Sequence, residues 1–217
     1  MGDEHPLIPL LKGLGAGRFP AGDGTVEVFP GPPGPVDGVL AFFAHFVVAA
    51  DVEAEWVRAQ LPPGDYIAPL GHRFISAMSE RLGAEAGNLD LVFVAPPGSG
   101  VPEIDLVELS PEMDHPRVAR SRRWRTDIRV YGTPDGEGLL IVGRGLACRW
   151  EAAFEVQPGS RNRGLGRALC AAARGLIPSG ETLFLQVAPG NVASVRAILA
   201  TGAKPIGAEV LFTRSRG

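Results

Sequence analysis

The alternation of strand-like and helix-like segments over residues 104–217 most constrains the fold of this 217-residue chain. Short apolar runs there are separated by segments with helical spacing, and the predicted order is β-α-β-β-β-α-β-α-β. The strands are expected at 104–109, 128–131, 138–145, 149–157, 183–187 and 208–213, and the helices from Pro111 or Pro116 to 124, at 164–174 and at 191–200. Thr133-Pro134-Asp135-Gly136 is typical of a hairpin turn.

Residues 1–103 predict a smaller α/β module. We expect mostly loop over Gly13–Gly38, a strand at 25–29, one buried strand at 36–50, helices at 52–61 and 71–82, and a strand at 89–95. The breaker Pro96-Pro97-Gly98-Ser99-Gly100 then predicts a boundary between two domains, 1–103 and 104–217.

Charge is distributed unevenly between these two parts. The net charge is −3 overall, but it is −8 over residues 1–103 and +5 over residues 104–217. A basic half indicates either an anionic ligand or electrostatic attraction between the two parts. Because the whole chain is acidic, it is not expected to be a protein that coats nucleic acid.

The sequence lacks the patterns typical of disulfide-bonded, metal-binding, membrane-spanning and secreted proteins. Cys148 and Cys170 form no CxxC pair, and His72 and His115 have no partner at metal-ligand spacing, so neither a disulfide framework nor a metal site is expected. The longest apolar run is too short to cross a bilayer, and the first residues do not resemble a signal peptide. We therefore expect a cytoplasmic protein whose partners include neither membrane nor nucleic acid.

The most informative segment runs from Phe154 to Leu169, where a strand ends, a polar turn follows and a helix begins on Gly164-Leu165-Gly166. Glycine lets a ligand approach the backbone closely, and the first N–H groups of a helix lack intrahelical partners. Arg161, Arg163 and Arg167 lie at the same helix end, where their charge opposes the helix dipole unless an anion compensates them. The segment predicts a pyrophosphate cradle; the alternative is a tight turn with no ligand.

Two common phosphate loops do not fit this segment. A Walker A loop needs Gly-Lys-Ser/Thr, but Arg167 and Ala168 follow Gly166 here. A dinucleotide-binding fingerprint needs a third glycine where Leu169 stands, and an acidic residue about twenty positions later, where only Gln186 is offered.

The segment instead resembles the GNAT superfamily of N-acyltransferases. Its signature, Arg/Gln-x-x-Gly-x-Gly/Ala after a strand, is matched by Arg161-Asn162-Arg163-Gly164-Leu165-Gly166. A second match follows at the expected distance, with a strand at Leu183–Val187 and then Asn191-Val192-Ala193-Ser194 opening a helix. The resemblance covers about half of the chain and implies a mixed, mostly antiparallel twisted sheet flanked by helices. Residues 1–103 have no comparable match; they would shape the acceptor site or be a degenerate copy of the same fold.

The resemblance implies acetyl-CoA as co-substrate and a primary amine as acceptor. The backbone amides from Arg161 to Arg167 would hold the pyrophosphate, the strand edge at Val156 would pair with the pantetheine arm, and Asn191 would hold that arm from the other side. The amine would attack the thioester directly in a ternary complex. The alternative is a module that binds or senses acyl-CoA without catalysis, and a third hypothesis is an arginine-rich partner-binding protein that has kept only the fold.

Catalytic residues are less clearly indicated. Glu151 and Glu155 lie four residues apart on the strand where the family often carries a base, so both point to one face. The alternative is that both are ordinary ion-paired carboxylates. The family's tyrosine near the end of the last helix is replaced by Ile198, and Ser194 is the substitute proton donor that the resemblance suggests; such a serine can also simply hydrogen-bond within the first helical turn.

An arginine-rich helix lies just before the predicted hairpin. It carries Arg117, Arg120, Arg122 and Arg123, with Arg125 directly after it. Three interpretations stay open: this helix receives an acidic substrate, pairs with the acidic first half, or is solvated.

Overall fold

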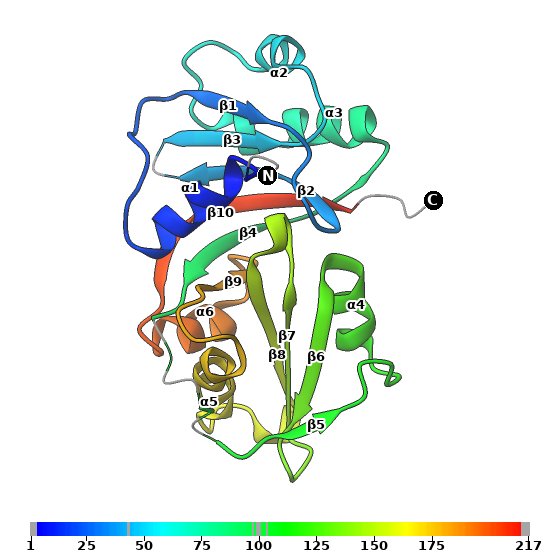
Figure 1. Ribbon diagram of the computed structural model, residues 1–217. Coiled ribbons are helices and arrows are strands. Elements are labelled where there is room, and N and C mark those ends of the chain that lie inside the picture. The colour runs from blue at the N-terminus through cyan, green and yellow to red at the C-terminus, as the bar shows by residue number, and fades with distance from the viewer. Residues whose placement is uncertain (1–3, 43, 97, 99–100, 103, 214–217) are drawn as a thin grey trace.

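One mixed sheet of ten strands forms the centre of the computed structural model, which describes residues 4–42, 44–96, 98, 101–102 and 104–213 (Figure 1). The strand order is β1-β3-β2-β10-β4-β9-β8-β7-β6-β5. Among these described strands, β1 and β3 pair in parallel, as do β8 and β9, and the other neighbours are antiparallel. The strands are β1 Val26–Phe29, β2 Val36–Phe42, β3 His45–Ala49, β4 Glu85–Val94, β5 Val107–Leu109, β6 Thr126–Gly132, β7 Gly138–Arg144, β8 Trp150–Val156, β9 Leu183–Val187 and β10 Lys204–Thr213.

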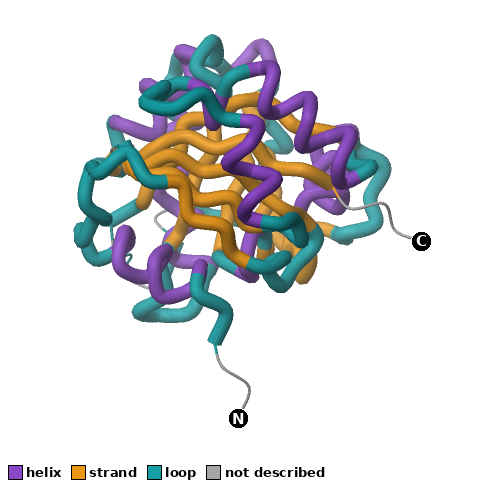
Figure 2. Tube along the Cα trace, turned by 90° about the horizontal axis from the view of Figure 1, so that it is seen from above, coloured by secondary structure: helices purple, strands orange, loops and turns teal. Residues whose placement is uncertain are grey.

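Helices cover both faces of this sheet, so its central strands are buried on both sides (Figure 2). The helices are α1 Leu7–Gly15, α2 Ala54–Gln60, α3 His72–Leu82, α4 Pro116–Trp124, α5 Leu165–Ala172 and α6 Val192–Leu199. Helices α1 and α4 pack on one face, where their cores include Leu11 with Val92 and Val118 with Ile141. Helices α2, α3, α5 and α6 pack on the other face. The fold class implied by the resemblance is confirmed.

The predicted single strand Val36–Ala50 is wrong: the chain makes two antiparallel strands there, β2 and β3. Ala44 adopts the left-handed conformation with φ 60°, which supports a tight chain reversal. Apart from Asp37 and His45 the run is apolar, because both strands are covered on both faces, and no alternation marks the turn.

Most other predicted elements agree with the structure to within a few residues at their ends. Helix α4 begins at Pro116 rather than Pro111, and β5 covers only Val107–Leu109 of the strand expected from Ile104. Helix α1 was not predicted, although Leu7, Leu11 and Leu14 follow the spacing of one buried helix face. Of the predicted breaker, residues 97, 99 and 100 lie outside the described residues.

The two segments expected as separate domains share this one sheet. Strand β4 of residues 1–103 lies between β9 and β10, and β10 in turn pairs with β2. The sheet is therefore continuous across the predicted boundary, with strands of the two segments interleaved. Whether residues 1–103 and 104–217 are separate folding units stays a prediction.

Candidate functional site

The site begins where two parallel strands diverge. Strands β8 and β9 pair only from Trp150 with Leu183 to Ala152 with Leu185. Beyond that point β8 stays paired with β7, while β9 stays paired with β4. The end of β8 therefore has an open edge on the side of β9.

Backbone groups of β8 point across this open edge. The Gln157 N–H bonds to the carbonyl of Glu137, the residue before β7, at 2.9 Å. Backbone groups alternate along an antiparallel strand, so Phe154 and Val156 direct theirs away from β7 and toward the opening. Consistently, the Val156 carbonyl accepts a hydrogen bond of 3.3 Å from Nε of Arg161.

The start of α5 lies beside this opening and is exposed. The turn that precedes it places Asn162 at φ 62° and Gly164 at φ 88°, both left-handed. A Cβ atom at Gly164 would meet nothing within 4 Å, so the protein itself does not fill this turn. The first hydrogen bond that closes the helix joins Ala168 N–H to the Gly164 carbonyl at 3.1 Å. Within the described chain, the backbone N–H groups of residues 163–167 have no acceptor.

The predicted cradle residues are thus placed together at one surface. Arg161, Asn162, Arg163, Gly164 and Arg167 are exposed, and Leu165 and Gly166 are half-buried. Five N–H groups at a helix start, with arginines around them, can hold a phosphate or pyrophosphate. Asn191 lies at the start of α6, where its side chain accepts a hydrogen bond of 3.2 Å from Ser194 N–H and so caps that helix.

A cavity of about 430 Å³ opens between the diverging strands and α4. Its lining comes mainly from β4, α4, β8, β9 and α6, with Leu211 of β10, and includes Glu151, Glu155, Asn191 and Ser194. Residues 161–167 are not part of this lining; the start of α5 lies beside the end of β8, where Gly166 is next to Phe154 and Val156. Within the described chain the Ser194 hydroxyl has no hydrogen-bond partner, which differs from the alternative of a bond within the first helical turn.

Both predicted base candidates are ion-paired. Glu155 is about one-third exposed, and its carboxylate lies 2.8 Å from Nε of Arg117 on α4. Glu151 is buried and contacts Arg149 at 2.8 Å and Arg125 at 2.9 Å. Burial alone would raise the pKa of Glu151, but the two guanidinium groups outweigh it and lower that pKa. Both carboxylates are thus ion-paired, and a role of either one as the base stays a prediction.

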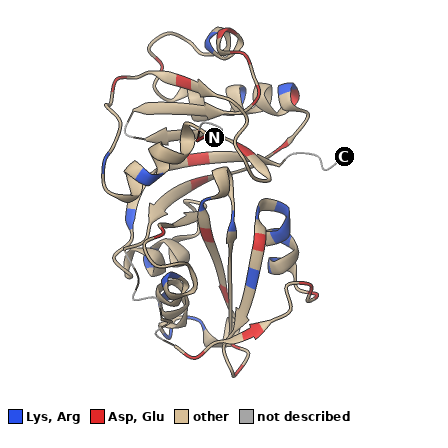
Figure 3. Cartoon of the chain, viewed as in Figure 1, with Lys and Arg blue, Asp and Glu red and all other residues tan. Residues whose placement is uncertain are grey.

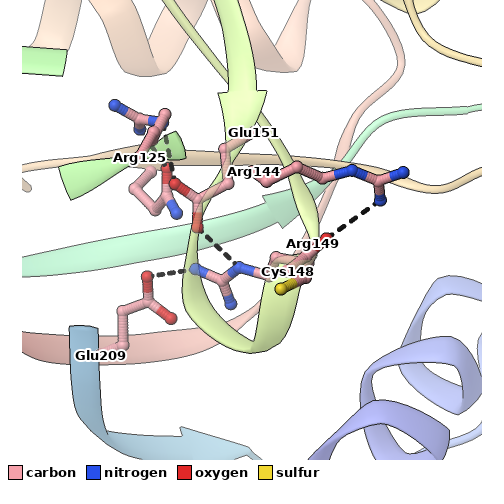
Figure 4. Close-up of polar contacts among 7 residues, drawn as sticks. Arg125, Arg144, Cys148, Arg149, Glu151 and Glu209 are labelled. Atoms are coloured by element: carbon pink, nitrogen blue, oxygen red, sulfur yellow. Dashed lines mark hydrogen bonds and ion pairs between the residues drawn. The ribbon is translucent and has the colours of Figure 1, made fainter. Parts of the chain in front are cut away.

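Glu151 belongs to a buried charge network that the sequence did not predict (Figure 4). Arg149 lies between two carboxylates, with Nη2 at 2.5 Å from Glu209 on β10. Gly145 makes room for this network, because a Cβ atom there would lie 2.2 Å from the Glu151 carboxyl carbon. Arg149, Arg125, Glu151 and Glu209 together are neutral.

Asp90 lies next to this network but has no ion-pair partner in it. It lies on β4 directly opposite Glu209, and it also lines the cavity. Burial, and then the charge of Glu209, raise its pKa to about 6, against the opposing effects of Arg120 and Arg125. In the described chain no hydrogen bond or ion pair reaches the Asp90 side chain. Sequence reasoning missed Asp90 because a single aspartate in a strand carries no motif.

The charge of Asp90 is expected to destabilise the protein at neutral pH. Its pKa in the folded state lies above the unfolded value near 3.8, so folding favours the protonated carboxyl and stability falls as pH rises from about 4 through 6. Asp90→Asn should raise the free energy of unfolding at pH 7.5 by on the order of 1 kcal/mol, since partial exposure screens part of the cost.

Urea unfolding at pH 7.5 and at pH 4.5 measures this effect. The gain of Asp90→Asn should shrink at the lower pH, where the wild-type carboxyl is protonated. Glu85→Gln on the same strand removes an exposed carboxylate and should change stability by less than about 0.5 kcal/mol at either pH. A loss of stability in Asp90→Asn at pH 7.5 would contradict the raised pKa.

Basic residues gather on α4 (Figure 3). Most of its arginines are paired with acidic residues, one of them from the first part of the chain. Arg123 pairs with Glu85 of β4, Arg122 with Glu112, and Arg117 with Glu155. Arg125, just past the helix, pairs with Glu151. Arg120 is exposed, lines the cavity and has no ion pair or hydrogen bond to the described chain.

Comparisons with known proteins give structural neighbours and no sequence relatives. No family model matches the chain, and no curated protein matches it. GNAT-family acetyltransferases are among the solved structures that resemble it. One from Colwellia psychrerythraea has a TM-score of 0.39 and 14% identity over 65% of this chain and 61% of its own. A putative GNAT acetyltransferase from Novosphingobium aromaticivorans has a TM-score of 0.40 and 21% identity over 61% and 68%.

A third neighbour is described as a GCN5-related N-acetyltransferase from Kribbella flavida, with a TM-score of 0.39 and 14% identity over 66% of this chain and 64% of that one. This chain thus spans less than two thirds of the Colwellia and Kribbella proteins. In the described part of the chain no group of His, Cys, Asp or Glu could hold a metal ion, and no helix is long and apolar enough to cross a membrane.

Proposed function

We propose that this protein is an acyl-CoA-dependent N-acyltransferase that transfers an acetyl group from acetyl-CoA to a primary amine. The observation that carries the proposal is the open β8 edge beside an exposed helix start with five unpaired N–H groups. The two features match two parts of the co-substrate. The N–H groups of residues 163–167 can bind its diphosphate, and the backbone of Phe154 and Val156 can pair with the amides of its pantetheine arm.

Bound acetyl-CoA would supply the electrophile, an acetyl thioester. The chain's contribution would be to hold the amine in the cavity near the β8 edge and to exclude bulk water from it. The Val156 N–H can donate to an oxygen that becomes negative during attack. The Ser194 hydroxyl, which lines the same cavity and has no partner in the described chain, can donate a proton to the departing thiolate as the N–C bond forms and the C–S bond breaks; the proton that the amine nitrogen loses in that step would return to Ser194 through water.

Calorimetry with acetyl-CoA and with desulfo-CoA tests the binding part of this proposal. Both ligands carry the diphosphate and the pantetheine arm, so both should bind with comparable affinity. Absence of binding would overturn the proposal and leave a partner-binding protein that has kept only the fold.

Release of free thiol from acetyl-CoA over a panel of primary amines tests catalysis. We expect thiol release that depends on the amine. Tight binding of acetyl-CoA without release for any amine would favour a sensing module, an alternative that rests on Ile198 standing where the family often has a tyrosine.

A further inference from the structure

The cavity holds one carboxylate and one guanidinium that the protein's own side chains leave unmatched. Among its described lining residues, Glu151, Glu155, Arg117 and Arg125 are ion-paired with one another or with Arg149. Asp90 and Arg120 line the same cavity, and neither has an ion pair or hydrogen bond. The cavity is thus left with one negative and one positive group.

These two groups lie on different walls of the cavity. Asp90 belongs to β4, which is part of the sheet, and Arg120 belongs to α4, which packs on the sheet face that carries Glu151 and Glu209. Arg120 is near enough to Asp90 to influence its pKa, yet the two side chains form no ion pair with each other. Arg123 and Glu85 show that ion pairs do join α4 to β4 directly elsewhere.

The α4 wall is built to face the cavity. Pro116, Arg117, Arg120, Ser121 and Trp124 follow helical spacing, so one side of the helix lines the space. Trp124 packs against β4 at Gly87: a Cβ atom on Gly87 would lie only 2.9 Å from the Trp124 ring. The sheet wall adds the half-buried Gln186, whose Oε1 accepts a hydrogen bond of 3.1 Å from Arg125 and whose amide faces Glu151 and Glu209. This amide therefore belongs to the buried charge network, and Asp90 and Arg120 are the charged groups left for a ligand.

We propose that the acceptor is a small zwitterion with one primary amine and one carboxylate, the class of free amino acids, with its ammonium end at Asp90 and its carboxylate at Arg120. This inference rests on the proposed function, because it names the acceptor of that same site. A guanidinium binds a carboxylate through two parallel hydrogen bonds, and a carboxylate binds an ammonium group through charge-assisted hydrogen bonds. The bound amine end lies on the sheet wall, which also carries the diverging strands β8 and β9. To become the neutral nucleophile, the ammonium group gives one proton to the Asp90 carboxylate, which passes it to water.

The zwitterion accounts for both unmatched charges at once. A simple amine would leave Arg120 without a counter-charge inside the cavity, and a dicarboxylate would place a second negative charge beside Asp90 and Glu209. Free amino acids also fit a cavity of about 430 Å³, which is within the usual range for small-molecule sites.

The test compares three matched probe sets with the protein and acetyl-CoA: the twenty free amino acids with β-alanine and γ-aminobutyrate, the corresponding amides, and the corresponding amines without a carboxyl group. Thiol release gives kcat/KM, and calorimetry with the protein saturated with desulfo-CoA gives binding. We expect at least one free amino acid to exceed its amide about tenfold or more in kcat/KM or affinity, because the amide loses a charged hydrogen bond.

Two variants and two matched controls identify the groups. Arg120→Gln should abolish the preference for the acid over the amide, and Asp90→Asn should weaken binding of acid and amide alike, since both carry the ammonium group. Arg123→Gln on the same helix and Glu85→Gln on the same strand lie outside the cavity lining and should leave both preferences unchanged.

Equal or better use of the amides, or an effect of Arg120→Gln on acid and amide alike, overturns the inference. So does failure of every free amino acid to bind or react while desulfo-CoA binds, a result that leaves the proposed function intact. Loss of desulfo-CoA binding itself in the wild-type protein would instead overturn the proposed function, whatever the amino acids do.

Discussion

Replacing Arg149 by methionine is expected to lower the free energy of unfolding by about 3–5 kcal/mol, because it leaves one buried carboxylate without a counter-charge and a second with one guanidinium in place of two. Glu151 and Glu209 are each about 1% exposed, and Arg149 contacts both. Of the two carboxylates, Arg125 pairs only with Glu151, so Glu209 would lose its counter-charge entirely. Urea unfolding at pH 7.5 measures the effect.

The double variant Arg149→Met, Glu209→Gln separates the lost charge from the lost packing. It removes the uncompensated charge, keeps the shape of the Glu209 side chain and leaves Glu151 paired with Arg125, so it should recover at least about half of the loss. Arg149→Lys keeps the charge but loses the planar fork, and should be intermediate. If Arg149→Met is too unstable to purify, Arg149→Lys tests the same account. A change of less than about 0.5 kcal/mol in the free energy of unfolding of Arg149→Lys would contradict it.

The reason for this large expected effect is where the network lies in the sheet. Arg149 directly precedes β8, and Glu209 lies on β10, which pairs with β2 and β4. The network therefore joins β8, which carries the candidate site, to β10, and β10 is the strand that pairs with β2 and β4 of residues 1–103. It also holds Glu151 on the cavity wall, beside Asp90.

Local patterns in the sequence predicted the elements of residues 104–217, because each of those signals spans only a few neighbouring residues. The hairpin at Thr133–Gly136, β9 at Leu183–Val187 and the turn before α5 are examples. The placement of β4 between β9 and β10 could not be predicted in this way, since strand order depends on pairing between residues far apart in the chain.

One part of the candidate site could be predicted from local sequence and the other could not. The cradle at residues 161–167 is one continuous segment, so its motif could be recognised in the sequence. The cavity is made mainly from β4, α4, β8, β9 and α6, so no single segment of the sequence predicts it. One signal was available for the buried network: Glu209 interrupts the apolar run from Ala208 to Phe212, and a buried charge in such a run needs a partner.

Gly164→Asp is expected to weaken acetyl-CoA binding at least about tenfold relative to Gly164→Asn. The two side chains have nearly the same shape, and both tolerate a left-handed backbone such as the φ of 88° at this position. They differ in charge, and the aspartate would lie among the free N–H groups of residues 163–167, where the diphosphate is expected. Calorimetry at a fixed salt concentration gives the ratio, and tenfold corresponds to about 1.4 kcal/mol.

The comparison of Asp with Asn at Gly164 is what makes this test specific to charge. Either substitution fills the open space at this turn to the same extent, so any steric loss appears in both variants. Gly64→Asp supplies the control for charge elsewhere, because Gly64 also has a left-handed φ of 75° and open surroundings, but lies in the loop between α2 and α3. Its acetyl-CoA affinity should equal that of the wild type. Equal affinities of Gly164→Asp and Gly164→Asn would mean that no anionic group of the co-substrate lies at the start of α5, and the cradle would have to be placed elsewhere along the β8 edge.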